Sequence, residues 1–202
     1  MSSRGGNLSP AILGGHAMKA NYNEILHETK TIECKSIILR RFRGADAHDV
    51  LEYASDEETV KHLIWAGAKT IDEAKASIYN NYLAEPGIFA IALKENDKCI
   101  GDITLKLSPS HERAVFGYML HRAYWGKGIM SEALTAILSL CFDKLELHRV
   151  EGGHFTGNEA SGRVMEKCGM IKEGVAREVY KAHGVFRDEV RYGILKEEWV
   201  NR

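Results

Sequence analysis

At residues 125–133 the chain reads WGKGIMSEA, a glycine turn between a predicted strand and a predicted helix. Gly126 and Gly128 stand one residue apart, so the backbone can approach a ligand closely and point successive N–H groups into one concavity. The helix that starts here adds unpaired N–H donors and a partial positive charge. This pattern predicts a site for phosphate oxygens, with Lys127 as a further point charge; the alternative is an ordinary glycine turn.

Two other phosphate-binding motifs do not fit this segment. A Walker A loop, G-x-x-x-x-G-K-S/T, fails because His121 stands five residues before Gly126 and Gly128 follows the lysine. A dinucleotide fingerprint, G-x-G-x-x-G, meets Ser131 where its third glycine or alanine belongs. These differences disfavour a nucleotide-binding oxidoreductase.

The apolar pattern on either side of the turn predicts one mixed α/β (α+β) domain. Strands are predicted by short apolar segments at residues 37–42, 88–93, 99–105, 114–121, 149–155, 175–180 and 186–195. Helices are predicted between the first two strands, directly after the glycine turn, and from Asn158 to Gly169. Residues 31–202 are interpreted as a single domain. Residues 1–30 are interpreted as an N-terminal extension, either disordered or, as far as residue 17, not native, with Met18 as a candidate natural start.

Composition excludes several classes of protein. The 202 residues carry 27 Lys+Arg against 28 Asp+Glu, so a protein that grips nucleic-acid phosphates directly is disfavoured. No run of 18 apolar residues or secretion signal occurs, and we therefore expect a cytoplasmic protein without a membrane partner. The four cysteines form no C-x-x-C pair and the nine histidines no H-E-x-x-H motif, so no metal site is expected.

An ordered set of short motifs surrounds the glycine turn. The chain reads GYML at 117–120, YWGKG at 124–128, SEA at 131–133, NEAS at 158–161, EKCGM at 166–170 and EG at 173–174, after an early ILRRF at 38–42. With this set the chain resembles the GNAT N-acetyltransferases, and most of all their RimJ/RimL-like group. The resemblance implies the GNAT-type acyl-CoA N-acyltransferase fold. That fold is a central, mostly antiparallel, twisted sheet of about seven strands, splayed in the middle and flanked by about four helices.

The resemblance also implies acetyl-CoA as cosubstrate. In this family the pyrophosphate lies on the backbone N–H groups of the glycine turn, and the pantetheine arm follows the strand before it. The family's glutamine or arginine three residues before the first glycine is Ala123 here. The expected cofactor-binding residues are Met119, Leu120, His121, Trp125, Gly126, Lys127, Gly128, Ile129, Met130, Ser131, Asn158 and Ser161.

For catalysis the resemblance implies direct attack of an amine on the thioester, without a covalent enzyme intermediate. The backbone N–H of Leu120 is the expected donor to the carbonyl oxygen. The family's sulfur-protonating tyrosine is Met165 here, so Ser161 is expected to take that role, although a serine in a first helical turn is usually a cap. Asn158 is expected to cap the same helix and to contact the pantetheine arm.

The sequence does not decide which residue acts as the general base that deprotonates the amine. The family's acidic residue on the strand before the turn is absent, because residues 114–116 read AVF. Glu178 and Tyr180 are predicted to alternate toward the same face of the penultimate strand and are the nearest catalytic candidates. Asp188 and His154 follow, with an ordered water as the alternative. Trp65 and Tyr180 are expected at the acceptor site.

The preferred function is therefore acetyl transfer to a protein or peptide amino terminus, of the ribosomal-protein type. The alternatives are acetylation of a small amine (antibiotic, polyamine or amino acid) and a catalytically silent CoA-binding sensor, which Met165 would suit. The absence of a strong acidic cluster disfavours a polyamine. By analogy with relatives a homodimer is allowed.

Overall fold

The computed structural model describes residues 22–202, so the candidate start at Met18 lies outside the described residues. Eight strands form one sheet in the order β1-β2-β3-β4-β5-β6-β8-β7. All neighbours are antiparallel except β5 and β6, which are parallel. The strands are β1 (Thr31–Glu33), β2 (Ile37–Arg40), β3 (Ile88–Leu93), β4 (Cys99–Ser108), β5 (Arg113–Leu120), β6 (Arg149–Phe155), β7 (Ile171–Ala182) and β8 (Val185–Leu195).

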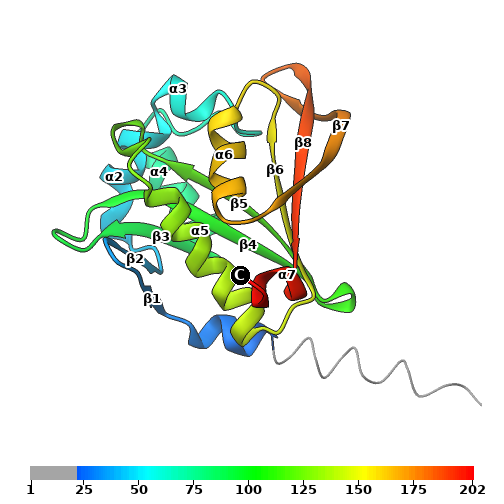
Figure 1. Cartoon of the computed structure of the whole chain (residues 1–202). Coiled ribbons are helices and arrows are strands. Elements are labelled where there is room, and N and C mark those ends of the chain that lie inside the picture. The colour runs from blue at the N-terminus through cyan, green and yellow to red at the C-terminus, as the bar shows by residue number, and fades with distance from the viewer. Residues whose placement is uncertain (1–21) are drawn as a thin grey trace, which may run out of the picture.

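Helices cover both faces of the sheet. Figure 1 shows α5 (Ile129–Ser139) and α6 (Glu159–Lys167) in front of the strands, and α2 (Ala47–Ala54) and α4 (Ile71–Ser77) behind them. Each face has its own apolar core, one built on α5 and the other on α2 and α4. The short helices α3 (Glu57–Val60) and α7 (Lys196–Val200) complete the set that Figure 1 labels. Within residues 22–202, no helix combines the length and apolarity needed to cross a bilayer.

The architecture confirms the predicted mixed α/β class and differs from the prediction at its N-terminal end. The sheet has eight strands rather than about seven, because residues 31–33 add a short strand beside β2. Residues 22–28 form a helix, although the sequence placed them in the extension. Tyr22 and Leu26 of this helix are buried in the core built on α5, so the packed region begins before residue 31.

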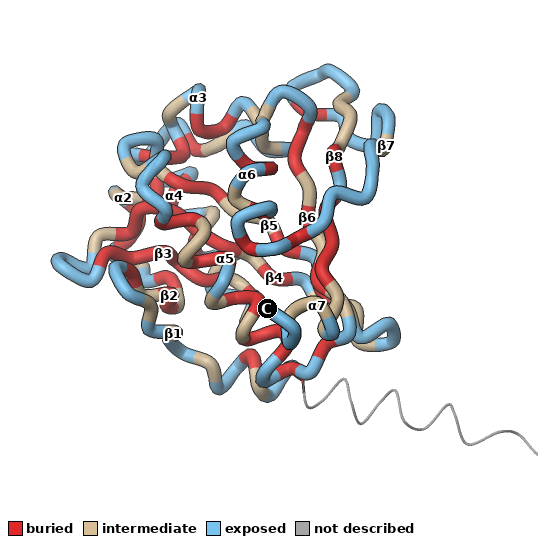
Figure 2. The backbone as a smooth tube through the Cα atoms, viewed as in Figure 1, coloured by how far each residue is buried: buried red, intermediate tan, exposed pale blue. Residues whose placement is uncertain are grey.

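Burial of the strands decreases from the centre of the sheet to its β7 edge. Figure 2 shows the central strands β3 and β4 largely buried and β7, the edge strand, almost entirely exposed. The predicted closing hairpin is present as β7 and β8, joined at His183 and Gly184. His183 Nε2 lies 3.1 Å from the Leu63 carbonyl oxygen, so the tip of this hairpin meets the segment after α3.

The sheet splits between its two parallel strands. β5 and β6 pair only where Arg113–Val115 lies beside Arg149–Glu151, and then separate. At the first unpaired position the buried Phe116 ring packs against Gly152, where an added Cβ would lie 2.5 Å from a ring carbon. The ring thus occupies the space that a side chain on β6 would need. The separation leaves a gap in the middle of the sheet.

Gly152→Ala tests this packing. The added methyl should clash with the Phe116 ring and lower the free energy of unfolding by about 1–3 kcal/mol, the usual cost of overpacking a core. Urea denaturation measures the change. Phe116→Leu in the same chain should recover part of the loss, and a Gly152→Ala protein as stable as wild type would contradict the account.

Candidate active site

The glycine turn presents open backbone at the start of α5. Gly126 and Gly128 adopt φ of 72° and 82°, in the left-handed region that favours glycine. A Cβ at either position would meet nothing within 4 Å, so the glycines leave a hollow beside the backbone. Gly128 is the N-cap of α5 and supplies no side-chain cap. The first N–H groups of the helix are therefore available to an anion.

A cavity of about 240 Å³, the turn cavity, extends from this glycine turn to α6. Its walls include parts of α3, β5, the glycine turn, the first turn of α5 and α6 between Ala160 and Lys167. Of the expected cofactor-binding residues, those that line it are Met119, Leu120, Trp125, Gly126, Gly128, Ile129, Met130, Ser131, Asn158 and Ser161.

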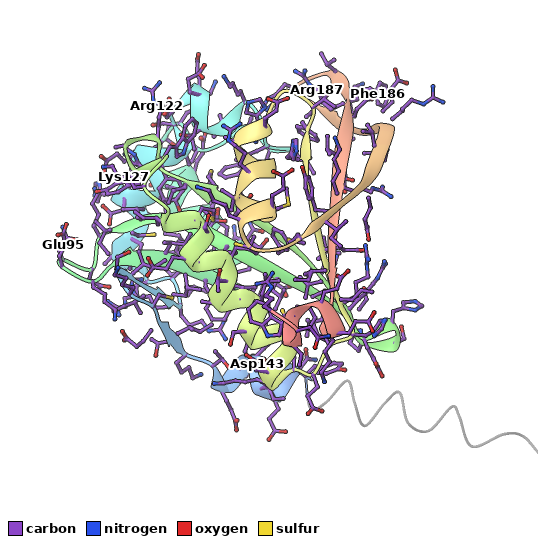
Figure 3. The ribbon with its side chains drawn as sticks, viewed as in Figure 1. Glu95, Arg122, Lys127, Asp143, Phe186 and Arg187 are labelled. Carbon is purple, nitrogen blue, oxygen red and sulfur yellow. The ribbon has the colours of Figure 1, made fainter. Side chains whose placement is uncertain are left out.

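Two of the expected cofactor-binding residues do not line the turn cavity. His121 Nδ1 accepts a hydrogen bond from the Ala123 N–H at 3.0 Å, and its Nε2 lies 3.3 Å from a Glu52 carboxylate oxygen. Lys127 lies at the outer edge of the molecule in Figure 3, with its Nζ 5.2 Å from the centre of the Tyr124 ring. Local partners therefore hold the imidazole, while the lysine turns outward against an aromatic ring.

The end of β5 offers a free backbone donor to the gap. The His121 N–H donates to the Ile100 carbonyl at 2.7 Å, so His121 and Ile100 form a hydrogen-bonded pair of the ladder. In an antiparallel ladder, hydrogen-bonded pairs of residues alternate with pairs that exchange no hydrogen bond. The next pair, Gly101 with Leu120, is thus the non-bonded kind, and the Leu120 N–H faces away from β4. On that side β6 has already separated from β5. The indole of Trp125 fixes this strand end by donating to the Leu120 carbonyl at 2.7 Å.

Ser161 has a partner that the sequence did not predict. The Tyr118 hydroxyl lies 2.7 Å from Ser161 Oγ, and it also donates to the Ser161 carbonyl at 3.1 Å. Both residues line the turn cavity, and burial raises the pKa of the Tyr118 phenol above its usual value. Tyr118 sits in the GYML motif, but only its contact across the gap to α6 connects it with the serine. Met165 is fully buried in the core.

Asn158 was expected to cap α6 with its side chain. It occupies the N-cap position, but its side chain makes no capping hydrogen bond. Its φ of −112° and ψ of 56° place the residue in a turn outside the extended region typical of N-caps. Instead, Asn158 lies in the walls of the turn cavity and of a second, larger cavity.

This second cavity, the split groove, has a volume of about 680 Å³. β5 lines it with Arg113 and with every residue from Val115 to Met119, and β6 lies on the far side of the gap. Tyr118, Asn158 and Ser161 line both cavities, so the two meet at the gap between β5 and β6. A ligand in one cavity can therefore contact a ligand in the other.

The acceptor-site candidates fall partly into the split groove. Trp65 and Tyr180 line it, and the Tyr180 ring packs 6.1 Å from the Phe155 ring centre. Among the proposed bases, His154 also lines the groove, with Nδ1 2.8 Å from the Phe155 carbonyl oxygen.

Glu178 and Asp188 are not among the residues that line the groove. The prediction that Glu178 and Tyr180 alternate toward one face is wrong, because β7 bulges between Ala176 and Tyr180. Glu178 has φ of 51° in this bulge, which breaks the period of two, and its N–H donates to Asp188 at 2.8 Å. Figure 3 shows Phe186 and Arg187 projecting at the outer edge beyond this hairpin.

Comparison with known proteins gives the family. A model described as an acetyltransferase (GNAT) domain matches residues 36–171. The chain belongs to the GNAT acetyltransferases. It is 33% identical over 168 residues to the uncharacterized N-acetyltransferase YnaD of Bacillus subtilis, covering 83% of this chain and 98% of the relative. A GNAT-family acetyltransferase structure from Bacillus anthracis superposes with TM-score 0.75 at 29% identity, covering 83% of this chain and 99% of that one.

A third relative is more distant. The ribosomal protein uS5-alanine N-acetyltransferase of Escherichia coli is 24% identical over 132 residues, which cover 63% of this chain and 68% of the relative. These findings confirm the GNAT fold and N-acetyltransferase activity, and the family implies the use of acetyl-CoA.

The residues present fit acetyl-CoA. The hollow beside Gly126 and Gly128 and the uncapped start of α5 suit its pyrophosphate, and the turn cavity leads from there to Leu120 and Ser161. Acetyl-CoA supplies the activated acetyl group. The role of the Leu120 N–H in stabilising negative charge on the acetyl oxygen stays a prediction. The role of the Ser161 hydroxyl, which lies 2.7 Å from the Tyr118 hydroxyl, as proton donor to the leaving sulfur also stays a prediction.

Two glycine-to-alanine variants test whether the glycine turn binds the pyrophosphate of acetyl-CoA. Acetyl-CoA at about a hundred times its Kd should raise the Tm by about 5–10 °C. Gly128→Ala should at least halve this shift, because the methyl enters the hollow. Gly184→Ala is the matched control, since Gly184 has the same φ of 82° and equally open surroundings at the hairpin tip. Equal shifts in the two variants would place the cofactor elsewhere.

Ser161→Ala tests the proton donor. The variant should lower kcat about 100-fold or more, the usual loss when a general acid is removed. The KM for acetyl-CoA should stay close to wild type, because the glycine turn is untouched. Tyr118→Phe, which keeps the serine but removes its hydroxyl partner, should give a smaller loss. An unchanged kcat in Ser161→Ala would remove this serine from the mechanism.

Proposed function

We propose that this enzyme transfers the acetyl group of acetyl-CoA to the amino terminus of a protein or peptide. The observation that carries the proposal is the length of the split groove. It is lined along β5 from Arg113 to Met119, a span of about 20 Å for a strand that rises about 3.3 Å per residue. An extended peptide of several residues matches this span, whereas a small amine would occupy only the part at the gap.

The charges in the split groove also suit a peptide. Three glutamates in its walls are each paired with an arginine, at 3.0 Å for Arg113–Glu151, 2.5 Å for Arg149–Glu173 and 3.0 Å for Arg191–Glu189. Paired in this way, they do not form the unbalanced acidic cluster that a polyamine with several positive charges would call for. Their mixed donors and acceptors can instead hydrogen-bond a peptide backbone.

The comparisons support the same class of acceptor. The Escherichia coli relative is named for an alanine of a ribosomal protein, which is a protein acceptor. Because the two sequences are only 24% identical, the name supports a protein as the class of acceptor but does not say which protein it is. A ribosomal-protein amino terminus is accordingly the first acceptor to try.

The groove also suggests how the acceptor enters. Trp65 and Tyr180 line the groove near the hairpin tip, where His183 meets Leu63. The amine would reach the gap from the groove while acetyl-CoA occupies the turn cavity. Direct attack then needs no covalent enzyme intermediate, because the two ligands meet between β5 and β6.

A length series of acceptors tests the proposal. We expect kcat/KM to rise at least about tenfold from alanine amide to an alanine-led hexapeptide, because only the longer acceptor uses groove contacts remote from the gap. Putrescine, spermidine, an aminoglycoside and free amino acids form the comparison panel. A small amine preferred over every peptide would overturn the proposal. No turnover of any acceptor, combined with a Tm shift by acetyl-CoA, would instead indicate a CoA-binding sensor.

A further inference from the structure

Asp102 is a carboxylate in the middle of the sheet that the sequence-based reasoning passed over. It lies on β4, within the apolar run Cys99–Leu105, and pairs across the ladder with Met119. Opposed residues on neighbouring strands point to the same face of a sheet, and Met119 lines both cavities. Asp102 itself lines the split groove. It is therefore one strand away from the Leu120 N–H that faces the gap.

The Asp102 carboxylate is buried without a full set of partners. The residue is 6% exposed, and its Oδ2 makes no hydrogen bond. The buried acid Asp46 differs, because Arg40 donates to both of its oxygens at 2.8 and 2.9 Å. A buried polar group without a partner costs free energy, so a partner supplied by a ligand would offset that cost. Asp46 thus has its partners within the protein, whereas Asp102 Oδ2 has none among the described residues.

The groups around Asp102 carry no positive charge. Its titratable neighbours are Tyr53 on α2, Tyr82 in the π-helical turn (Ile78–Tyr82) after α4, and Cys99 on its own strand. The residues paired with it on β3 and β5, Ala90 and Met119, do not titrate. Burial raises the pKa of Asp102 to about 7. The carboxylate form is then present near neutral pH, and the protonated form is readily reached.

Other carboxylates in the split groove are already engaged. Glu151, Glu173 and Glu189 each pair with an arginine, and the bond from Arg149 lowers the pKa of Glu173. Among the carboxylates of the described residues that line the groove, Asp102 alone has no arginine partner. Carboxylate oxygens of these glutamates already accept hydrogen bonds from an arginine, so they are less free to take a proton from an amine.

We propose that Asp102 is the general base that takes a proton from the acceptor amine. The proposal rests on the proposed function, because it needs an amine in the split groove. The amine nitrogen forms a bond to the acetyl carbon and gives up one proton to the Asp102 carboxylate. The carbon–sulfur bond breaks, its electron pair stays on sulfur, and Ser161 supplies the proton that yields the thiol. Ser161 then regains a proton from solvent, and Asp102 loses its proton to solvent through the groove.

The first measurement is independent of turnover. Carbon-13 NMR of the full chain, labelled at aspartate Cγ, should show one carboxyl that titrates near pH 7 and is missing in Asp102→Asn. Asp72→Asn is the matched control, because it makes the same chemical change at a carboxylate whose side chain is 90% exposed. A midpoint near pH 4 for Asp102 would overturn the proposal, whatever the acceptor.

The second measurement is the pH profile of kcat/KM with the alanine-led hexapeptide. In the wild-type protein the value should fall about tenfold per pH unit below about pH 8, as the α-amino group of the peptide becomes protonated, and more steeply below about pH 7, as Asp102 becomes protonated too. Asp102→Asn should lower kcat by about 100-fold or more and lose only the steeper part of this fall, while it keeps the Tm shift with acetyl-CoA. Asp72→Asn should match wild type throughout. An Asp102→Asn protein with the wild-type profile would show that another group or water is the base.

These outcomes separate the base from the acceptor class. If a small amine is acetylated and peptides are not, the peptide proposal fails, and the same variants measured with that amine decide on Asp102. If peptides are acetylated and Asp102→Asn keeps the wild-type profile, only the assignment of the base fails. No turnover with any acceptor overturns both.

Discussion

The separation of β5 from β6 is the constraint on which the rest of this structure depends. Parallel pairing stops after Val115 and Glu151, and the Phe116 ring against Gly152 fills the first unpaired position. Backbone N–H groups along the sheet normally find partners in the next strand. Where that strand is missing, a ligand can take its place, and the Leu120 N–H lies at such a position. A continuous sheet would leave no passage between its two faces.

The gap divides the work of the enzyme between two faces. On the α5 and α6 side, the turn cavity contains the glycine turn and the Tyr118–Ser161 contact, which we predict to bind phosphate and to protonate sulfur. The split groove contains the paired glutamates and Asp102, and we propose that the acceptor binds there. Side chains alternate along β5, so Tyr118 and Met119 pack against the cores on opposite faces of the sheet. Both residues line both cavities, so this one strand can contact both ligands.

Two buried aspartates, Asp46 and Asp102, differ in their hydrogen-bond partners. Arg40 is 3% exposed and holds Asp46 and Asp97, which ties β2 to the turn between β3 and β4. This cluster is satisfied within the protein and contributes to the fold. Asp102 lines the split groove, and its Oδ2 has no hydrogen-bond partner among the described residues. A buried polar group without a partner calls for an explanation, and the proposed role as a base supplies one.

The sequence by itself determined the order of the elements, the glycine turn and the family resemblance, because these depend on local periodicity and on residues adjacent in the chain. The strand over Arg149–Phe155 and the closing hairpin of β7 and β8 could be predicted in this way. The bulge that turns Glu178 away could not, since it depends on the register of β7 against β8. The Tyr118–Ser161 contact and the place of Asp102 beside Met119 join residues far apart in the chain. Only tertiary structure decided them, because strand pairing and helix packing set which distant side chains share a cavity.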